Sequence, residues 1–352
     1  MKVSMRLATK EDAYLPSFDF TKLSAINTCP MWGIVRYTKH KTMHSGGRAM
    51  ALEAGKLMHE CFSAVRLYQL GFVQGMMDHM HVAGNKLFSK ARWDTMLAAS
   101  KGGGDTRSQQ RNMALECLAT GNYVEDPDDK KRTYLNMESS LAYYCDRWDN
   151  NRYPIWIRNN NDPTSDVGIE IGFDVVIHVY DAESVYDKTF RLVGRIDGLH
   201  VDRNGDLVAQ ENKTSVRLDR AWRESYHMSH QVTGYNVAAG VFANTIVDRG
   251  LVIGLTLPLP RSITDGIAYV PTIRPQFMKD QWLKWVLHTI DLHDTYIDDP
   301  MSAPKYTHSC NRYFRPCSFI PLCASDPEDR KLIYNDMPSD EWSPLHEQAT
   351  GD

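Results

Sequence analysis

A hairpin near the middle of the chain constrains the fold more than any other feature of the sequence. Residues 194–215, GRIDGLHVDRNGDLVAQENKTS, contain two β-rich runs separated by Asn204-Gly205. Asn-Gly is a strong turn signal, so the two runs are predicted to pair as antiparallel strands. The turn admits a two-residue loop, or a three-residue loop in which Gly205 takes a left-handed conformation.

The length of this loop decides the register of the two strands. A two-residue loop would place Asp197 and Glu211 on opposite faces, because a shift of one residue moves every side chain to the other face. The three-residue loop places Asp197 directly opposite Glu211, with Lys213 on the same face. Like charges opposite each other repel, so folding alone gives no reason for this register. A divalent cation between the carboxylates would give one, and we expect the three-residue loop.

Mg²⁺ or Mn²⁺ would suit such a site. Mg²⁺ prefers oxygen ligands in an octahedral shell and retains several waters. Asp197, Glu211 and the backbone carbonyl of Asn212 could supply protein ligands, and a retained water could become a nucleophile. Lys213 could stabilise the deprotonated water or the charge that develops on a phosphate. The alternative is an exposed hairpin whose charged side chains face water, which is the usual explanation of an isolated D…ExK pattern.

The pattern of the chain changes near residue 167. Before it, apolar spacing predicts helices, with 75–165 forming a helical insertion or cap. After it, short β-rich runs predict a sheet, followed by a single helix over 219–247. The other predicted helices are a short one carrying Cys29 within 21–40, one over 47–71 and one over 275–297. These elements predict one α/β domain over 1–352, with a mixed central β-sheet flanked by helices.

Composition narrows the class of protein without naming a function. A chain of 352 residues with 42% apolar residues can bury a large core. Its longest apolar region, 236–260, is interrupted by Asp248 and Arg249, so neither half has the roughly 20 residues of a membrane span. The N-terminus lacks the apolar segment of a signal peptide, which predicts a cytoplasmic, reducing location without disulfides and without a membrane partner.

Charge does not decide whether the chain binds nucleic acid. The net charge is −4, but DNA binding depends on a local basic face. Basic residues cluster at 39–41, at 130–132 and in RLDRAWR, which contains Arg217, Arg220 and Arg223. Each cluster is of a kind that is usually a solvated face.

Four motifs in order resemble the PD-(D/E)XK nuclease superfamily. The similarity is to the RecB-like exonucleases of the iron-sulfur type, which include AddB and the CRISPR-associated RecB-type nucleases. GKLMHE resembles the first motif of that family, GRID the second, ENK the third and QVTGY its Gln-x-x-x-Tyr motif. The resemblance implies a restriction-endonuclease-like core, expected at 166–290, and assigns no role to the helical region 75–165.

The resemblance also implies roles for individual residues. The metal ligands would be His59, Asp197, Glu211 and the Asn212 carbonyl, with Lys213 as the catalytic lysine and Glu170 as a further carboxylate that binds a second ion or orients a water. Gln231 and Tyr235 would bind DNA. They stand at i and i+4, so they share one helix face and could reach a phosphate or an unstacked base, or could simply pack the helix on the sheet.

Three cysteines lie in the Pro-containing segment CNRYFRPCSFIPLC of the tail, 300–330. These are Cys310, Cys317 and Cys323, and the resemblance implies a fourth ligand upstream, a position that Cys29 fits. Four cysteines in a reducing compartment suit a four-iron four-sulfur cluster or a structural Zn²⁺. The paired x₂ to x₄ spacing of zinc sites is absent, which favours the cluster, although relatives often space the first two cysteines more closely. Cys61, Cys117 and Cys145 fall in helical patterns and are expected in the core.

The expected activity is therefore a Mg²⁺- or Mn²⁺-dependent deoxyribonuclease that hydrolyses phosphodiesters by metal-activated water. An exonuclease acting on DNA with single-stranded ends, in DNA repair or recombination, is favoured. The alternatives are a non-catalytic DNA-binding or assembly subunit with the same fold and cluster, and a zinc-stabilised scaffold without a nucleic-acid partner. The motifs leave polarity, strand preference, oligomeric state and protein partner open.

Overall fold

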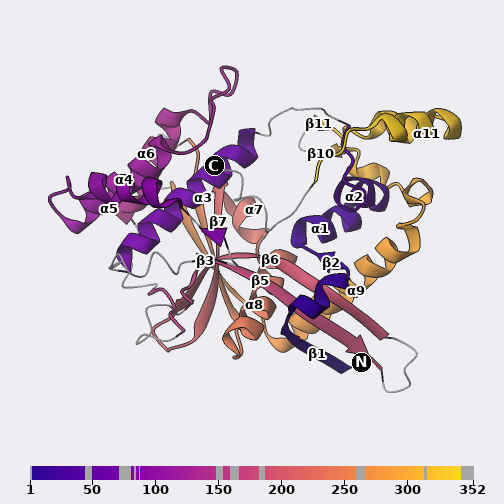
Figure 1. The fold of residues 1–352 in the computed structure, drawn as a ribbon, viewed down its shortest axis with the longest axis horizontal. Helices are drawn as coiled ribbons and strands as arrows, with labels where there is room; N and C mark the ends of the chain where they lie inside the picture. The colour runs from indigo at the N-terminus through magenta and orange to yellow at the C-terminus, as the bar shows by residue number, and fades with distance from the viewer. Residues whose placement is uncertain are drawn as a thin grey trace. The chain divides into compact units, whose positions relative to one another are not determined.

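The protein has a mixed α/β fold with a seven-stranded mixed sheet flanked by helices (Figure 1). The computed structural model describes residues 2–43, 50–70, 81–82, 85–86, 88–147, 154–158, 166–181, 187–258, 266–312 and 315–341. Within them the strand order is β1-β5-β6-β7-β8-β9, and β2 pairs with β6. The bounds are β1 (Lys2–Leu7), β2 (Ser17–Phe18), β5 (Ile169–Tyr180), β6 (Asp187–Val201), β7 (Leu207–Ser215), β8 (Arg249–Thr256) and β9 (Ile267–Ile273).

The chain divides into two compact units. The first comprises 1–47, 176–194 and 279–347, and the second comprises 48–175, 195–278 and 348–352. The long strands β5 and β6 contribute residues to both units, and so does the predicted core range 166–290. The tail and Cys29 belong to the first unit. The region 75–165 and every predicted ligand of the Mg²⁺ or Mn²⁺ site belong to the second.

The register prediction for the hairpin is confirmed. β6 and β7 are antiparallel, and their ladder runs from Val201↔Leu207 to Gly198↔Gln210. Gly205 has a φ of +85°, and its N–H donates to the Asp202 carbonyl at 3.0 Å, which closes a three-residue turn. β7 then pairs in parallel with β8, and β8 is antiparallel to β9.

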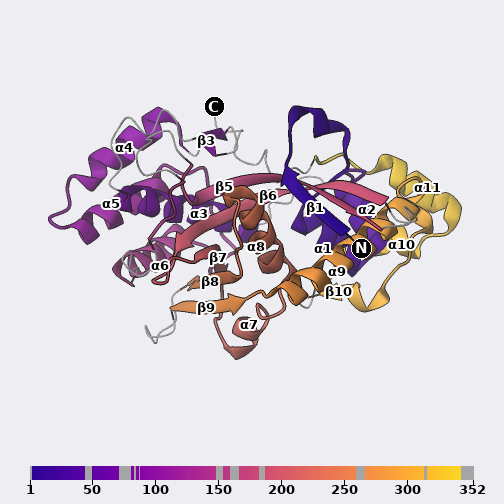
Figure 2. The same cartoon turned by 90° about the horizontal axis from the view of Figure 1, so that it is seen from below.

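Helices of the second unit pack on both faces of its strands. α3 (Met50–Gln69) contributes Leu57, Met58 and Val65 to a buried cluster that also contains Ile253 and Leu255 of β8. The other described elements of this unit are β3 (His81–Val82), β4 (Asn85–Lys86), α4 (Lys90–Ser100), α5 (Thr106–Ala119), α6 (Tyr134–Arg147), α7 (Arg220–Glu224) and α8 (His230–Ala243) (Figure 2). α8 covers the face of β8 on which Val252 lies, where Val232 packs against it. The described part of the region 75–165 contains the helices α4, α5 and α6, and also the short strands β3 and β4.

The prediction of one helix over 219–247 is wrong, because two helices stand there. α7 ends at Glu224 and α8 begins at His230, after the polar run 225–229. Ser229 N-caps α8 by accepting a hydrogen bond from Val232 N, and this cap lets a new helix start in a new direction. A left-handed Asn244 ends α8.

The first unit contains the elements around Cys29 and the tail. Cys29 lies between two helices rather than inside one, because Pro30 occupies the first position of the second helix. The elements are η1 (Lys10–Tyr14), α1 (Phe20–Thr28), α2 (Pro30–Tyr37), most of α9 (Gln276–Tyr296), η4 (Pro300–Ser302), η5 (Thr307–Ser309), β10 (Asn311–Arg312), β11 (Arg315–Pro316), α10 (Ile320–Ala324) and α11 (Pro327–Asp336). The edge strand β1 had no prediction from the sequence pattern.

Direct contacts join 36–42 to the last described residues of this unit. Lys41 Nζ donates to the Tyr334 carbonyl at 2.9 Å and lies 4.8 Å from the centre of the Tyr334 ring. Arg36 forms an ion pair of 2.5 Å with Asp340. The two ends of the unit are therefore connected by ordinary contacts in addition to any ligand that the cysteines hold.

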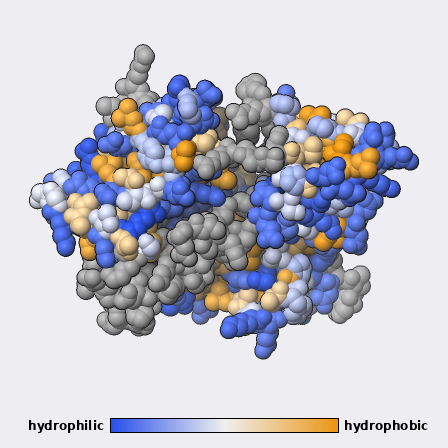
Figure 3. All heavy atoms as spheres, turned by 45° about the horizontal axis from the view of Figure 1, so that its top comes forward, coloured by the Kyte–Doolittle hydropathy of each residue, from blue (hydrophilic) through white to orange (hydrophobic). Residues whose placement is uncertain are grey.

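No helix in the described part of the chain is long and apolar enough to cross a membrane. Among the coloured residues in Figure 3, hydrophilic ones predominate, with hydrophobic residues scattered among them.

Candidate metal centre and cysteine site

The two carboxylates of the hairpin lie where the ladder between β6 and β7 ends. Continued by one residue beyond Gly198↔Gln210, the register sets Asp197 opposite Glu211. The Asn212 N–H donates to Asp197 Oδ2 at 2.6 Å. Asp197 and Glu211 are 7% and 3% exposed, so two acidic side chains share a buried region of one sheet face.

His59 of α3 reaches Asp197. Its Nδ1 lies 3.4 Å from Asp197 Oδ1. One potential ligand atom each of His59, Glu170 and Asp197 lies within 4.8 Å of the other two. Among the residues that the structure describes, no other set of three His, Cys, Asp or Glu side chains is that close. Glu211 is outside this set.

Glu170 adopts an unusual backbone conformation at the start of β5. Its φ is +48°, a left-handed value that a non-glycine residue rarely takes and that is common at functional sites. Ser63 Oγ donates to Glu170 Oε1 at 3.0 Å, and Arg195 Nη1 lies 3.7 Å from Glu170 Oε2. The strained residue is thus held with its carboxylate beside His59 and Asp197.

Two residues that orient Glu170 had no prediction from the sequence. Ser63 stands four residues after His59, so both lie on the same face of α3. Arg195 stands two residues before Asp197, so both lie on the same face of β6. These spacings were visible in the sequence, but the contact with Glu170 brings together three segments that are distant along the chain.

Glu211 is paired on one oxygen only. Lys213 Nζ forms an ion pair with Glu211 Oε1. Glu211 Oε2 is buried and has no hydrogen-bond partner among the described residues. A buried carboxylate oxygen without a partner is costly, so a ligand for Oε2 would stabilise the site. This donor set, three carboxylates and a histidine, fits a divalent cation.

Burial and neighbouring charges shift the pKa values of these groups, and not all in the same direction. Burial and the charge of Asp197 raise the pKa of Glu170 and of Glu211 from 4.5 to about 7. Burial also opposes ionisation of Asp197, but the nearby His59 outweighs it and lowers the pKa of Asp197. Burial favours neutral His59, yet Asp197 raises the pKa of His59 from 6.5 to about 9. A cation bound by His59 would have to displace this proton.

Gln231 and Tyr235 contact each other on α8, as their spacing predicts. Gln231 Nε2 donates to the Tyr235 hydroxyl at 2.9 Å. Tyr235 is 7% exposed and its ring packs edge-on against Phe173 of β5. Burial raises the pKa of Tyr235 well above its usual value, and the charges of Glu211 and Asp197 add to the effect. Tyr235 therefore combines packing with a position near the carboxylates.

A buried arginine lies on the opposite face of β6. Arg66 of α3 is 1% exposed and its Nη2 lies 2.5 Å from Nε2 of the buried His200. A Cβ on Gly198 would lie 2.4 Å from Arg66 Nη1, so the absence of a side chain at 198 makes room for the guanidinium. Neither Arg66 nor His200 had a predicted role.

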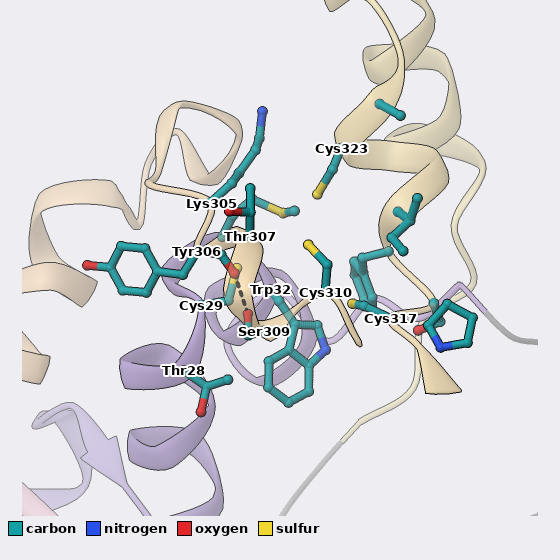
Figure 4. Close-up of a pocket in the computed structure, with 16 residues that line it drawn as sticks. Thr28, Cys29, Trp32, Lys305, Tyr306, Thr307, Ser309, Cys310, Cys317 and Cys323 are labelled. Atoms are coloured by element: carbon teal, nitrogen blue, oxygen red, sulfur yellow. Dashed lines mark hydrogen bonds between the residues drawn. The ribbon is translucent and has the colours of Figure 1, made fainter. Parts of the chain in front are cut away.

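The four cysteines of the first unit line one cavity of about 390 Å³. Figure 4 shows Cys29, Cys310, Cys317 and Cys323 around this space, with Trp32 beside them. Cys29 comes from the junction of α1 and α2, and the other three come from the tail. The Cys317 N–H donates to the Cys310 carbonyl at 2.7 Å, which holds these two cysteines together.

The sulfur positions bear on what the cysteines could hold. No three of these described cysteines place their sulfurs within 4.8 Å of one another. A tetrahedral zinc with bonds of about 2.3 Å would bring them to about 3.8 Å. In a four-iron cluster each thiolate binds a different iron, so the sulfurs are farther apart. Burial raises the pKa of Cys323 from 9.0 to about 11, which favours the neutral thiol in the absence of a ligand.

The other three cysteines are buried, as predicted. Cys61, Cys117 and Cys145 are each 0% or 1% exposed. Cys61 and Cys117 belong to α3 and α5 and lie in one core cluster with Cys145. Burial raises the pKa of Cys61 well above its usual value, which is typical of an unreactive core thiol.

Comparisons with known proteins do not assign a family. No family model and no curated protein matches the chain. Among solved structures the chain is similar to one described as the crystal structure of SSO0001, with 20% sequence identity and a TM-score of 0.27. The similarity covers 44% of this chain and 58% of that chain. At this TM-score the likeness carries no argument about fold or function, so the functional conclusion rests on the site itself.

Proposed function

We propose that the chain is a Mg²⁺- or Mn²⁺-dependent nuclease that hydrolyses phosphodiester bonds of DNA. The observation that carries the proposal is the convergence of His59, Glu170 and Asp197, whose ligand atoms lie within 4.8 Å of one another. The resemblance of the four motifs to the RecB-like exonucleases of the PD-(D/E)XK superfamily supports the same reaction and a restriction-endonuclease-like core.

The cost of burying these carboxylates supports a cation. Three acidic side chains, Glu170, Asp197 and Glu211, are each less than 8% exposed. Buried charge is tolerated in proteins where it is paired or binds a metal. His59 and Lys213 offset part of the charge, while Glu211 Oε2 is left without a hydrogen-bond partner among the described residues. A divalent cation would supply the missing charge.

Each side chain has a distinct role in the proposed reaction. His59, Asp197, Glu211 and the Asn212 carbonyl would hold the cation. Glu170, which lies closest to His59 and Asp197, would bind the same cation or a second ion, or orient a water. The cation would lower the pKa of water and offset charge on the phosphate. Lys213, whose side chain is 33% exposed, keeps a positive charge at the rim of the site and would stabilise charge on the phosphate. Gln231 and Tyr235 would contact the DNA.

We propose that the four cysteines of the first unit hold a four-iron four-sulfur cluster. Their arrangement around one cavity and the separation of their sulfurs favour it over a single Zn²⁺. Trp32 and Phe319 on the cavity wall would shield the cluster from water. Its role would be to join the segment around Cys29 to the tail, and not to take part in hydrolysis.

A cleavage assay with matched variants tests the nuclease proposal. End-labelled linear DNA and circular single-stranded and double-stranded DNA would be incubated with Mg²⁺, Mn²⁺ or EDTA. Asp197→Ala, Glu211→Ala and Lys213→Ala should each reduce the rate at least about 1,000-fold. Asp206→Asn, an exposed carboxylate of the same hairpin paired with Arg249, is the control and should cut at the wild-type rate.

The same assay separates the alternatives. Absent cleavage by well-folded wild type, with DNA binding retained, would favour a non-catalytic DNA-binding subunit. Cleavage that does not depend on metal would contradict the proposed metal site. Wild-type rates in all three alanine variants would contradict the assignment of the site. Stoichiometric zinc without iron in the purified protein would favour a zinc-stabilised scaffold over the cluster.

A further inference from the structure

The connection between β7 and α8 is a second feature that the nuclease proposal does not use. It spans residues 216–229, includes α7, and is called here the α7 segment. Its three arginines and two carboxylates give it a net charge of +1, whereas the whole chain carries −4. The segment links the strand that carries Lys213 to the helix that carries Gln231.

The α7 segment lies next to Lys213 on the same sheet face. Lys213 pairs in register with Gly254 of the parallel strand β8. Paired residues of adjacent strands are about 5 Å apart and point to the same face. The Trp222 ring lies on Gly254, since a Cβ there would be 2.3 Å from Trp222 Cη2. α7 therefore covers the surface directly beside the candidate site.

The segment is held in place by buried contacts. Arg274, which is 1% exposed, donates to the Tyr226 carbonyl at 2.6 Å and to Thr233 Oγ1 of α8 at 2.9 Å. Trp222 and Tyr226 meet edge to face, with ring centres 4.8 Å apart. Both pack against the apolar cluster of Val232, Val252 and Val270. A surface fixed in this way would lose little conformational entropy on binding a ligand.

Two of the three arginines of the segment point to solvent, whereas Arg223 donates to the Leu218 carbonyl. The side chains of Arg217 and Arg220 are 82% and 89% exposed. Arg220 shares its charge with Glu224 at 2.5 Å, and Arg217 lies 3.9 Å from Asp219. Exposed pairs of this kind contribute little stability, so both guanidinium groups can exchange their partners for a ligand at low cost. Met228, 68% exposed, adds an apolar surface beside them.

We infer that the α7 segment is a phosphate-binding subsite for the polynucleotide strand that enters the candidate site at Lys213. Arg217 and Arg220 would contact phosphates on one side of the bond to be cleaved. A single strand is favoured over a duplex, because exposed apolar and half-buried aromatic groups beside the cations can contact unpaired bases. The inference rests on the proposed function, which it extends by naming where the substrate strand lies.

Fluorescence anisotropy with a labelled 20-nucleotide thymidine strand tests the subsite. Ca²⁺ would replace Mg²⁺, and a gel would check that the strand stays intact. The test variant is Arg217→Gln with Arg220→Gln. The matched control is Arg107→Gln with Arg111→Gln, two exposed arginines on α5 of the same unit. Circular dichroism would verify that both variants fold like the wild type.

Two lost single-strand phosphate contacts should make the slope of log K against log salt shallower by about 1.4. At about 0.1 M salt this corresponds to a loss of affinity of roughly 10- to 30-fold. The α5 control should keep both the slope and the affinity of the wild type. An α7 variant that binds like the wild type, or a control that loses as much, would overturn the subsite.

Further arms identify the occupant and separate this inference from the nuclease proposal. Equal α7-dependent losses with a 20-base-pair duplex would overturn the choice of a single strand, and equal losses with polyglutamate would assign the surface to an acidic protein instead. α7-dependent DNA binding without cleavage would leave the subsite standing and remove the nuclease activity. Cleavage of DNA by the wild type, together with unchanged DNA binding in the α7 variant, would leave the nuclease activity standing and remove the subsite.

Discussion

The backbone N–H of Asn212 donates a hydrogen bond of 2.6 Å to the carboxylate of Asp197. The two residues lie just beyond the last paired residues of β6 and β7, Gly198 and Gln210. The Asp197 side chain thus accepts a hydrogen bond from the backbone of β7. This bond fixes the Asp197 carboxylate to the strand that also carries Glu211. The turn that sets the register is in this way connected to the position of a candidate metal ligand.

Ionisation of Glu170, Glu211 and His59 should lower the stability of the protein in EDTA as pH rises from about 4.5 to 9. Glu170 and Glu211 have a pKa of about 7 in the folded protein and 4.5 as ordinary side chains, and His59 has about 9 against 6.5. The folded state therefore binds more protons than the unfolded state across this window, which makes the slope of the unfolding free energy negative. Asp197, whose pKa is lowered, contributes stability that is fully present above its ordinary value of 3.8 and is lost only at lower pH, so it adds no slope in this window.

Urea unfolding at several pH values would measure this slope. A Glu170→Gln, Glu211→Gln double variant should flatten it between pH 4.5 and 7, whereas Asp206→Asn should not. Saturating Mg²⁺ should restore stability most at high pH, where the site has lost its protons. Stability that rises with pH in EDTA over this window would contradict the described charge arrangement.

Ser63→Ala should weaken the site without unfolding the protein. The change removes the hydroxyl that donates to Glu170 Oε1 at 3.0 Å, a contribution of about 1 kcal/mol. We expect Mn²⁺ affinity by calorimetry, and the cleavage rate, to fall about 5- to 10-fold. Ser139→Ala removes a hydroxyl that donates to the Leu135 carbonyl on α6 and is the control. Unchanged Mn²⁺ affinity in Ser63→Ala would mean that Ser63 does not position Glu170.

Gly205→Val should destabilise the protein by about 1–2 kcal/mol, because Gly205 has a φ of +85° and a left-handed β-branched residue is strained. No atom lies within 4 Å of a Cβ built there, so the cost is conformational and not steric. Gly205→Asn should cost less, since asparagine tolerates this conformation. Urea unfolding of the two variants and of Asn204→Val would compare them, and equal losses in all three would argue against a backbone cause.

The purified protein should be brown when prepared without oxygen, and four of its seven cysteines should be needed for iron. Cys29→Ala, Cys310→Ala, Cys317→Ala and Cys323→Ala should each lose iron and acid-labile sulfide. Cys61→Ala, Cys117→Ala and Cys145→Ala should keep both, with the cost of a small core truncation. Iron retained in Cys29→Ala would show that the distant ligand is misassigned.

Loss of the cluster should not by itself separate the ends of the first unit. Lys41 and Arg36 contact Tyr334 and Asp340 independently of the cysteines. A Cys29→Ala protein should therefore keep a cooperative unfolding transition at a lower temperature. Adding Lys41→Met should lower it further in that variant than in the wild type, as thermal unfolding followed by circular dichroism would measure.

The sequence by itself determined the hairpin. The choice of its register also needed the argument that a cation lies between Asp197 and Glu211, and the roles of His59 and Glu170 came from the resemblance of the motifs. Asn204-Gly205 and the alternation on either side are local signals, so they predicted the two antiparallel strands. The spacing of Gln231 and Tyr235 predicted their contact for the same reason. These features depend on neighbours a few residues away, which the backbone geometry of one element already relates.

Only the tertiary structure decided how distant segments complete the site. The left-handed conformation of Glu170, its contacts with Ser63 and Arg195, and the position of Trp222 beside Lys213 depend on packing between α3, β5, β6, α7 and β8. The break between α7 and α8 also follows from tertiary contacts, because Arg274 holds the Tyr226 carbonyl in the gap between the two helices. Local propensity is worth a few tenths of a kcal/mol per residue, whereas burying a large apolar side chain is worth several times more, so packing prevails where the two conflict.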